Sequence, residues 1–130
     1  MKYFLILLCL VMPAVLQTRL QAAEVSPLLS KELAGFSEQY ESLMLTVELA
    51  PGESSLPHRH NAHVFVYLLS GALQMQVGGG ELKSLRAGDT FYESPQDIHA
   101  VSHNPSSTDP AKFVVFMVKE IGAPVSVPAE

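Results

Sequence analysis

Short apolar runs separated by turn-forming residues fill the chain beyond Tyr40, and this spacing limits the fold more than any other feature of the sequence. The runs are rich in Val, Leu, Phe and Tyr, and clusters of Gly, Pro, Asn or Ser interrupt them about every ten residues, which is typical of short β-strands. No amphipathic helix pattern of useful length is visible after residue 22. The sequence therefore predicts an all-β domain built as a sandwich, a jelly roll or a barrel.

The apolar runs also predict where the strands lie. Apolar residues alternate with polar ones along 42–49, which indicates one buried face. Residues 64–69 and 113–118 are continuously apolar, as in strands covered on both sides. The predicted strands are 42–49, 64–69, 72–77, 90–93 and 112–119, with weaker ones at 81–85 and 98–102, and a glycine hairpin tip at 78–80. We expect five aromatic residues to pack in the core: Phe65, Tyr67, Phe91, Phe113 and Phe116.

Residues 1–22 predict a secretory signal peptide. Lys2 precedes an unbroken apolar run at 3–12, which has signal-peptide length and is too short to span a membrane comfortably. Ala22 and Ala23 offer a cleavage point, although the residues upstream are bulkier than usual, so an uncleaved anchor is the main alternative. We therefore expect a periplasmic or secreted protein with no membrane attachment after cleavage.

The mature chain would contain no cysteine, because Cys9 lies inside the signal segment, where the preceding Leu8 argues against lipidation. Its stability must then come from core burial, with a metal ion as a further contribution. Without Lys2 and Arg19, six basic residues remain against thirteen acidic ones, a formal net charge of −7. This balance, with no basic stripe, excludes nucleic acid as an expected partner.

The remaining chain divides into three parts. Residues 23–40 are expected to form an N-terminal arm, in which Ser30 could cap one helical turn that Gly35 ends. Residues 41–121 would form the barrel domain, with a loop at 103–110. The tail, 122–130, contains two prolines and should lie on the surface or pair at a sheet edge.

All five histidines fall between positions 58 and 103. Residues i and i+2 of an extended chain point to the same face, so His58 and His60 could reach one metal ion. His99 would approach from another strand, whereas His63 and His103 are expected to be ordinary polar residues beside the strands. An exposed His-x-His pair without a ligand role is the plainer alternative, and imidazole does not choose among zinc, copper, iron and nickel.

Two motifs resemble those of the cupin family. Residues 51–71 (PGESSLPHRHNAHVFVYLLSG) match the first cupin motif at Gly52, His58, His60 and Gly71. Residues 88–99 (GDTFYESPQDIH) match the second motif at its first glycine, Gly88, and at its histidine, His99, with Ser and Gln where Pro and Gly are usual. The resemblance covers about residues 43–119. It implies a double-stranded β-helix, the jelly-roll barrel of the cupins, preceded by the signal peptide and the arm.

The resemblance also implies one divalent metal ion, of Fe, Zn, Mn, Ni or Cu, held by His58, His60 and His99. The glutamate ligand of the first motif falls on Val64, which cannot bind a metal. Three outcomes are open. His63 could swing in, although the two-residue period of a strand argues against it; Glu93 could supply an oxygen; or the site has three histidines and open positions for water or substrate.

Two classes of function follow from this resemblance. Three-histidine cupin sites resemble those of cysteine and diketone-cleaving dioxygenases, which would bind an anionic chelating substrate, and a lyase, isomerase or hydrolase using another metal fits equally well. The candidate catalytic residues are Glu93, Tyr92 and His63. The alternative is a non-catalytic module that binds or senses a metal and a small-molecule ligand. A homodimer formed through 113–118 or the arm is the partner assembly that the resemblance suggests.

Overall fold

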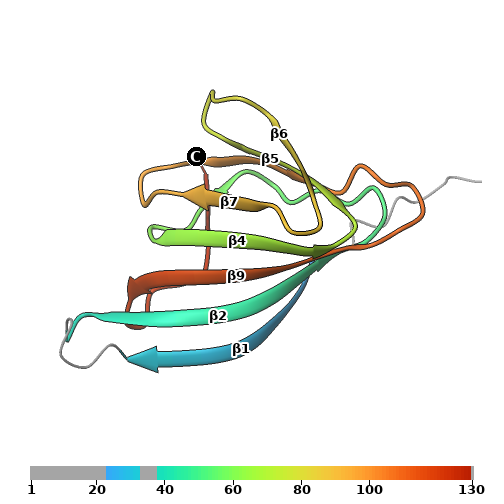
Figure 1. Ribbon diagram of the computed structural model, residues 1–130. Helices are drawn as coiled ribbons and strands as arrows, with labels where there is room; N and C mark the ends of the chain where they lie inside the picture. The colour runs from blue at the N-terminus through green and yellow to red at the C-terminus, as the bar shows by residue number, and fades with distance from the viewer. Residues whose placement is uncertain (1–22, 33–37, 130) are drawn as a thin grey trace, which may run out of the picture.

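The computed structural model describes residues 23–32 and 38–129, and the predicted signal peptide lies outside them (Figure 1). These residues form ten strands and no helix, so the all-β prediction is confirmed, and nothing within them is a helix able to cross a membrane. The strands are β1 (Glu24–Glu32), β2 (Tyr40–Leu49), β3 (His58–Arg59), β4 (His63–Ser70), β5 (Ala72–Val77), β6 (Lys83–Arg86), β7 (Thr90–Glu93), β8 (His99–His103), β9 (Ala111–Glu120) and β10 (Val127–Pro128).

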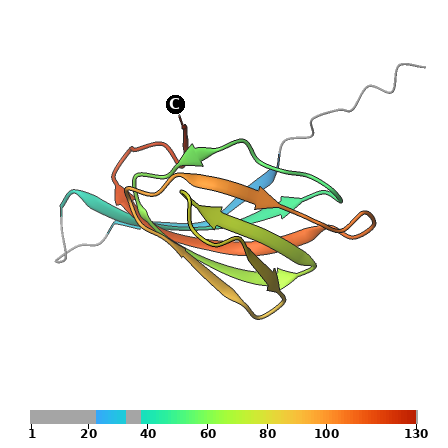
Figure 2. The same cartoon turned by 90° about the horizontal axis from the view of Figure 1, so that it is seen from above.

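The strands make two antiparallel five-stranded sheets, in the orders β1-β2-β9-β4-β7 and β10-β3-β8-β5-β6. Both sheets curve around one interior, as the view from above shows (Figure 2). Long-range pairings build this interior, because β9, late in the chain, lies between the early strands β2 and β4. The buried apolar core takes residues from both sheets, including Leu45, Val66, Leu73, Met75 and Met117.

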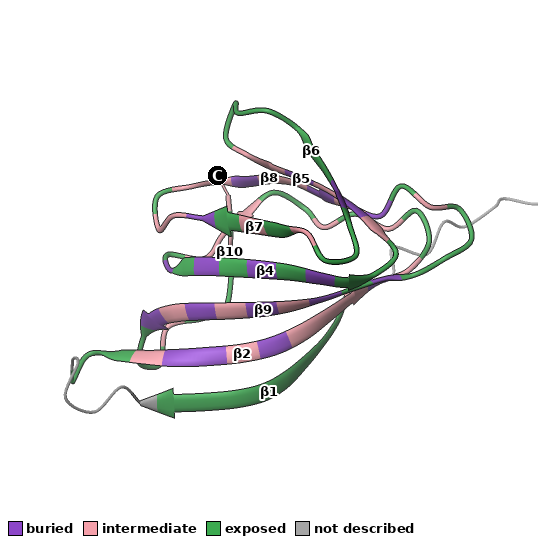
Figure 3. Ribbon diagram, in the orientation of Figure 1, coloured by how far each residue is buried: buried purple, intermediate pink, exposed green. Residues whose placement is uncertain are grey.

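The inner and outer faces alternate strictly along β4. Val64, Val66 and Leu68 are buried, whereas Phe65 and Tyr67 are 47% and 48% exposed, and Figure 3 shows the same banding along β9. The prediction that 64–69 is covered on both sides was therefore wrong, because only its inner face packs against the second sheet. The core assignment was also wrong for Phe65 and Tyr67, while Phe113 lies in the core as expected.

Strand β1 extends the first sheet. Residues 24–32 pair antiparallel with β2, from Glu24↔Glu48 to Glu32↔Glu41. Ser30 lies in this strand and donates its hydroxyl to Glu41, so it does not cap a helical turn. Of the two arrangements expected for the tail, the structure has the edge pairing: β10 adds to β3 through Val127↔Arg59 and Pro128↔His58.

Asn104, which directly follows β8, connects two parts of the barrel through its side-chain hydrogen bonds. Its side chain is fully buried, and Nδ2 donates to the carbonyl groups of Leu49, Ala50 and Asp109 at 3.2, 3.1 and 2.8 Å. Oδ1 accepts the Ser106 amide at 3.0 Å. One side chain therefore holds the loop before β9 to the end of β2, because every polar atom it carries is used.

Candidate metal centre

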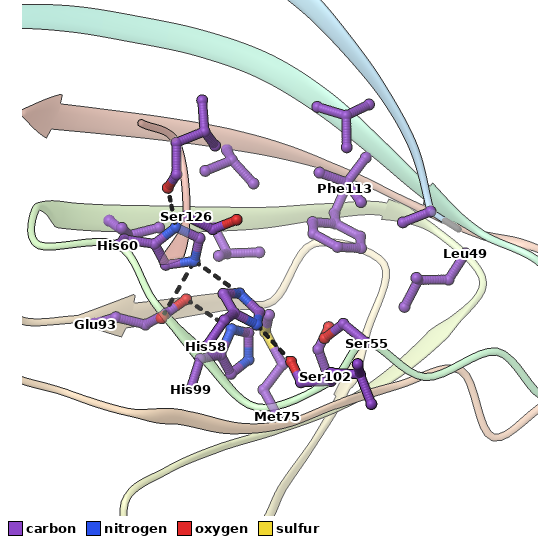
Figure 4. Close-up of a pocket in the computed structure, with 18 of the residues that line it drawn as sticks. Leu49, Ser55, His58, His60, Met75, Glu93, His99, Ser102, Phe113 and Ser126 are labelled. Atoms are coloured by element: carbon purple, nitrogen blue, oxygen red, sulfur yellow. Dashed lines mark hydrogen bonds and ion pairs between the residues drawn. The ribbon is translucent and has the colours of Figure 1, made fainter. Parts of the chain in front are cut away.

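The three histidines come together through one strand pairing. His58 lies on β3, and its Cα partner across the sheet is His99, the first residue of β8. His60 follows β3 directly. The centroid of the His58 ring lies 4.7 Å from that of the His60 ring and 5.0 Å from that of the His99 ring (Figure 4). Pairing across the sheet thus supplies the third imidazole that the two motifs suggest.

Hydrogen bonds to the backbone set the tautomers of two of these histidines. Nδ1 of His58 donates to the Leu56 carbonyl at 2.8 Å, and Nδ1 of His60 donates to the Val125 carbonyl at 2.6 Å. A carbonyl can only accept, so in the neutral rings the proton is on Nδ1 and the Nε2 lone pair is free. Metal-binding histidines are commonly oriented by such bonds from their other nitrogen.

The two free Nε2 atoms face each other at 3.1 Å. Two lone pairs at that distance repel each other unless a proton or a metal ion lies between them. Neighbouring ligands about 2.1 Å from one zinc-sized ion are about 3.0–3.4 Å apart, so this separation fits a shared ion. One ligand nitrogen from each of His58, His60 and His99 lies within 4.8 Å of the others, and this three-histidine group could hold a metal ion.

His99 is the most buried histidine of the group, at 4% exposed. Among the described residues, neither of its ring nitrogens has a hydrogen-bond partner. Burial, together with the nearby His58 and His60, lowers the pKa of His99 to about 3, and burial also lowers the pKa of His60. The rings of His60 and His99 are therefore neutral at pH 7, which is the form that binds metals. A buried imidazole without a hydrogen bond is costly unless one of its nitrogens binds a metal ion or another ligand.

Known proteins resemble this chain in sequence pattern and in fold. The sequence pattern of the cupin domain family matches residues 45–117. The chain belongs to the cupins. Similar solved structures include a double-stranded β-helix protein from Klebsiella pneumoniae (21% identity, 81% of this chain and 85% of that one, TM-score 0.59). No curated protein matches closely enough to count as a relative.

Two other structures show how widely the fold is used. The DMSP lyase DddQ from Ruegeria pomeroyi is 18% identical over 72% of this chain and 44% of that one, with a TM-score of 0.59. The Cnp3 cupin domain from Schizosaccharomyces pombe is 13% identical over 78% and 63%, with a TM-score of 0.61. At these identities the likeness concerns the fold alone, so function depends on the site.

In this cupin, one carboxylate reaches the histidine group. Glu93, at the end of β7, is 2% exposed. Its Oε1 lies 3.3 Å from Nδ1 of His99, and its Oε2 lies 3.7 Å from Nε2 of His60 (Figure 4). Burial, with a smaller contribution from Asp97, raises the pKa of Glu93 to about 8. A bound cation would favour the ionised carboxylate and oppose this shift.

The structure separates the three candidate catalytic residues. Glu93 faces the barrel interior, whereas His63 and Tyr92 lie on the exposed outer face. There, Nδ1 of His63 is 2.7 Å from the Tyr92 hydroxyl, and the two rings stack. His63 therefore points away from the histidine group, as the two-residue period of β4 requires.

A cavity of about 500 Å³ opens beside the histidines. It extends from His58, His60 and His99 towards Leu49 and Phe113 (Figure 4). The sequence analysis missed the part played by the tail, because Val125 to Pro128 line this cavity and the Val125 carbonyl orients His60. No residue type marks a carbonyl acceptor in a sequence, so only the pairing of β10 with β3 reveals it.

Proposed function

We propose that this cupin binds one divalent metal ion through His58, His60 and His99, with Glu93 as the fourth ligand, and acts on a small molecule there. The observation that carries the proposal is the pair of Nε2 atoms 3.1 Å apart whose Nδ1 atoms are already committed to carbonyl groups. The unpartnered nitrogens of His99 and the two nearby oxygens of Glu93 support the same ion position.

The arrangement suits an enzyme rather than a purely structural metal site. Four protein ligands leave positions free on an ion that prefers five or six, and the adjoining cavity gives a small molecule access to them. When bound, such an ion would supply Lewis-acid or redox chemistry. The chain's own contribution would be to orient the imidazoles through Leu56 and Val125 and to exclude water with the apolar cavity wall.

Because the Glu93 carboxylate points at the histidine group, this proposal favours an oxygenase over an enzyme that needs a free general base. A lyase or isomerase needs a base near its substrate, and both His63 and Tyr92 face outward. If Glu93 is engaged as a ligand, none of the three candidates remains as a free base. An oxygenase needs no such group. Because none of the three candidates would be a free base, a non-catalytic binding or sensing role is the second candidate function.

Metal titration with matched histidine variants tests this proposal. Purified mature protein would be titrated by calorimetry with zinc, manganese, nickel, copper and, without oxygen, ferrous iron. We expect one ion per chain, complete loss of binding in His99→Ala, and unchanged binding in His63→Ala, whose ring lies on the outer face. Equal binding by both variants would contradict the ligand assignment.

Oxygen uptake then separates the two candidate functions. The iron-loaded protein would be mixed with a panel of thiols, diketones and uncharged apolar alcohols in an oxygen electrode. Uptake that requires His58 and His60 supports the oxygenase, and a flat response across the panel with metal bound favours the binding module. We also propose a periplasmic or secreted location, which the predicted signal peptide supports and which the N-terminal sequence of the native protein would test.

A further inference from the structure

The cavity beside the histidine group has one polar end and one long apolar wall. His58, His60, His99 and Glu93 lie at one end, and Leu49 and Phe113 lie at the other (Figure 4). Its volume of about 500 Å³ is within the range of small-molecule sites, about 300–1,000 Å³. A ligand that fills it would therefore touch the metal-binding groups with one end only.

The wall of this cavity is built from the inner faces of β2, β4 and β9. Leu45, Val66, Phe113 and Val115 all line it, and each is at most 6% exposed. Two-residue periodicity places these side chains inside, because the outer positions of the same strands face away. Transfer of an apolar group from water to such a wall is favourable by about 0.8 kcal/mol per methylene.

The charges around the cavity argue against an anionic ligand. No lysine or arginine is among the described residues that line it, whereas Glu53 and Glu93 are. Lys119 is buried, but its ammonium group already pairs with Glu41 and donates to the Ala123 carbonyl. An anionic group could be paired only with the metal ion, so any charge on the body of the ligand would be buried unpaired against apolar groups, which is costly.

We infer that this cavity binds an uncharged small molecule with an apolar body and a single nitrogen or oxygen donor directed at the histidine group. The inference rests on the proposed function for the donor end and on the cavity wall for the body. It replaces the anionic chelating substrate expected from the resemblance. A dicarboxylate would find no cationic side chain on the wall and would leave its second charge among Leu, Val and Phe side chains.

Binding of 1-alkylimidazoles to the zinc-loaded protein tests this at pH 8, from methyl to hexyl. The donor is constant across the series, so only the apolar body changes. We expect affinity to rise about fourfold per methylene until the cavity is filled, and we expect succinate and malonate to bind more weakly than 1-butylimidazole. Affinity that does not change with chain length, or tighter binding of the dicarboxylates, would overturn the inference.

Matched variants place the effect in the cavity. Val66→Phe fills the inner face of β4 and should remove most of the gain from butyl to hexyl, whereas Tyr67→Phe on the outer face should not. Val115→Met serves the same purpose on β9 if Val66→Phe does not fold. A chain-length gain that survives both inward variants would mean that the alkyl group binds elsewhere, and would contradict the assignment.

An experiment on the metal-free protein separates this inference from the proposed function. Propylbenzene carries no donor atom, so its binding depends on the wall alone. We expect it to shift the methyl NMR signals of Leu45, Val66 and Val115 in the metal-free protein and not those of exposed Leu82, which does not line the cavity. If the protein binds no metal but propylbenzene binds in this cavity, the metal proposal fails and the apolar site stands. If propylbenzene shifts none of these signals, the apolar site is overturned.

Discussion

Val64 and Glu93 are directly opposite Cα partners on the antiparallel strands β4 and β7. Directly opposed residues share a sheet face, with Cβ atoms about 4.5–5.5 Å apart, and both side chains here are buried, at 1% and 2% exposed. The first cupin motif would place its carboxylate at position 64. In this chain the neighbouring strand presents a carboxylate at the same depth, so the site keeps its acidic group although the motif has lost it.

Moving the carboxylate back across the strand pair tests this relationship. We expect Glu93→Gln to weaken metal binding about 10- to 100-fold, because the charged oxygens near His60 and His99 are lost. Combining Val64→Glu with Glu93→Val should recover most of the affinity, measured by competition with a chelator. Glu48→Gln, on an exposed surface pair with Lys112, is the matched control and should have no effect. Wild-type affinity in Glu93→Gln would show that this carboxylate does not serve the ion.

The tail is expected to position His60. A chain that ends at Ala123 lacks the Val125 carbonyl and the β10 pairing, so the His60 ring loses its acceptor. We expect metal affinity to fall about 10- to 100-fold while the circular dichroism of the β-domain is retained. A chain that ends at Pro128 keeps both features and should bind as wild type. Equal affinity in the two truncated chains would rule out a positioning role.

Asn104 should contribute to stability and not to metal affinity. Asn104→Ala leaves the Leu49, Ala50 and Asp109 carbonyls without their donor, so we expect the free energy of unfolding to fall by about 2–4 kcal/mol. Asn104→Asp should be at least as harmful, because an oxygen would face these three carbonyls. Urea unfolding measures both, with Ser107→Ala in the same exposed loop as the control. A loss below about 0.5 kcal/mol would contradict this role.

Glu41 predicts a pH dependence of stability. Hydrogen bonds from Lys119 and then Ser30 hold the pKa of Glu41 below its ordinary value of 4.5. A carboxyl whose pKa is lowered by folding stabilises the native state above the unfolded pKa, and the stabilisation is lost as pH falls through the lowered pKa. We therefore expect the Tm difference between wild type and Glu41→Gln to be constant from pH 6 to 8 and to shrink below about pH 4.5. A difference as large at pH 3 as at pH 7 would contradict the assignment.

Sequence patterns were sufficient for the fold class and for the grouping of His58, His60 and His99, because strand periodicity and motif spacing are local properties. They could not settle the direction of Glu93, since that depends on the register between β4 and β7, which pairs residues far apart in the chain. The same limit explains Phe65 and Tyr67, whose apolar character suggested burial although one face of β4 faces outward. Strand β1 was missed because Pro27 and charged residues interrupt its pattern.

The metal content of the protein isolated from its own compartment tests the central claim most directly. Elemental analysis of the native protein, beside a His58→Ala/His60→Ala variant purified in the same way, compares two chains that differ only at the proposed ligands. We expect about one divalent ion per chain in the native protein and none in the variant. A native protein that carries no metal, and takes up none from iron, zinc, copper, nickel or manganese, would contradict the metal centre.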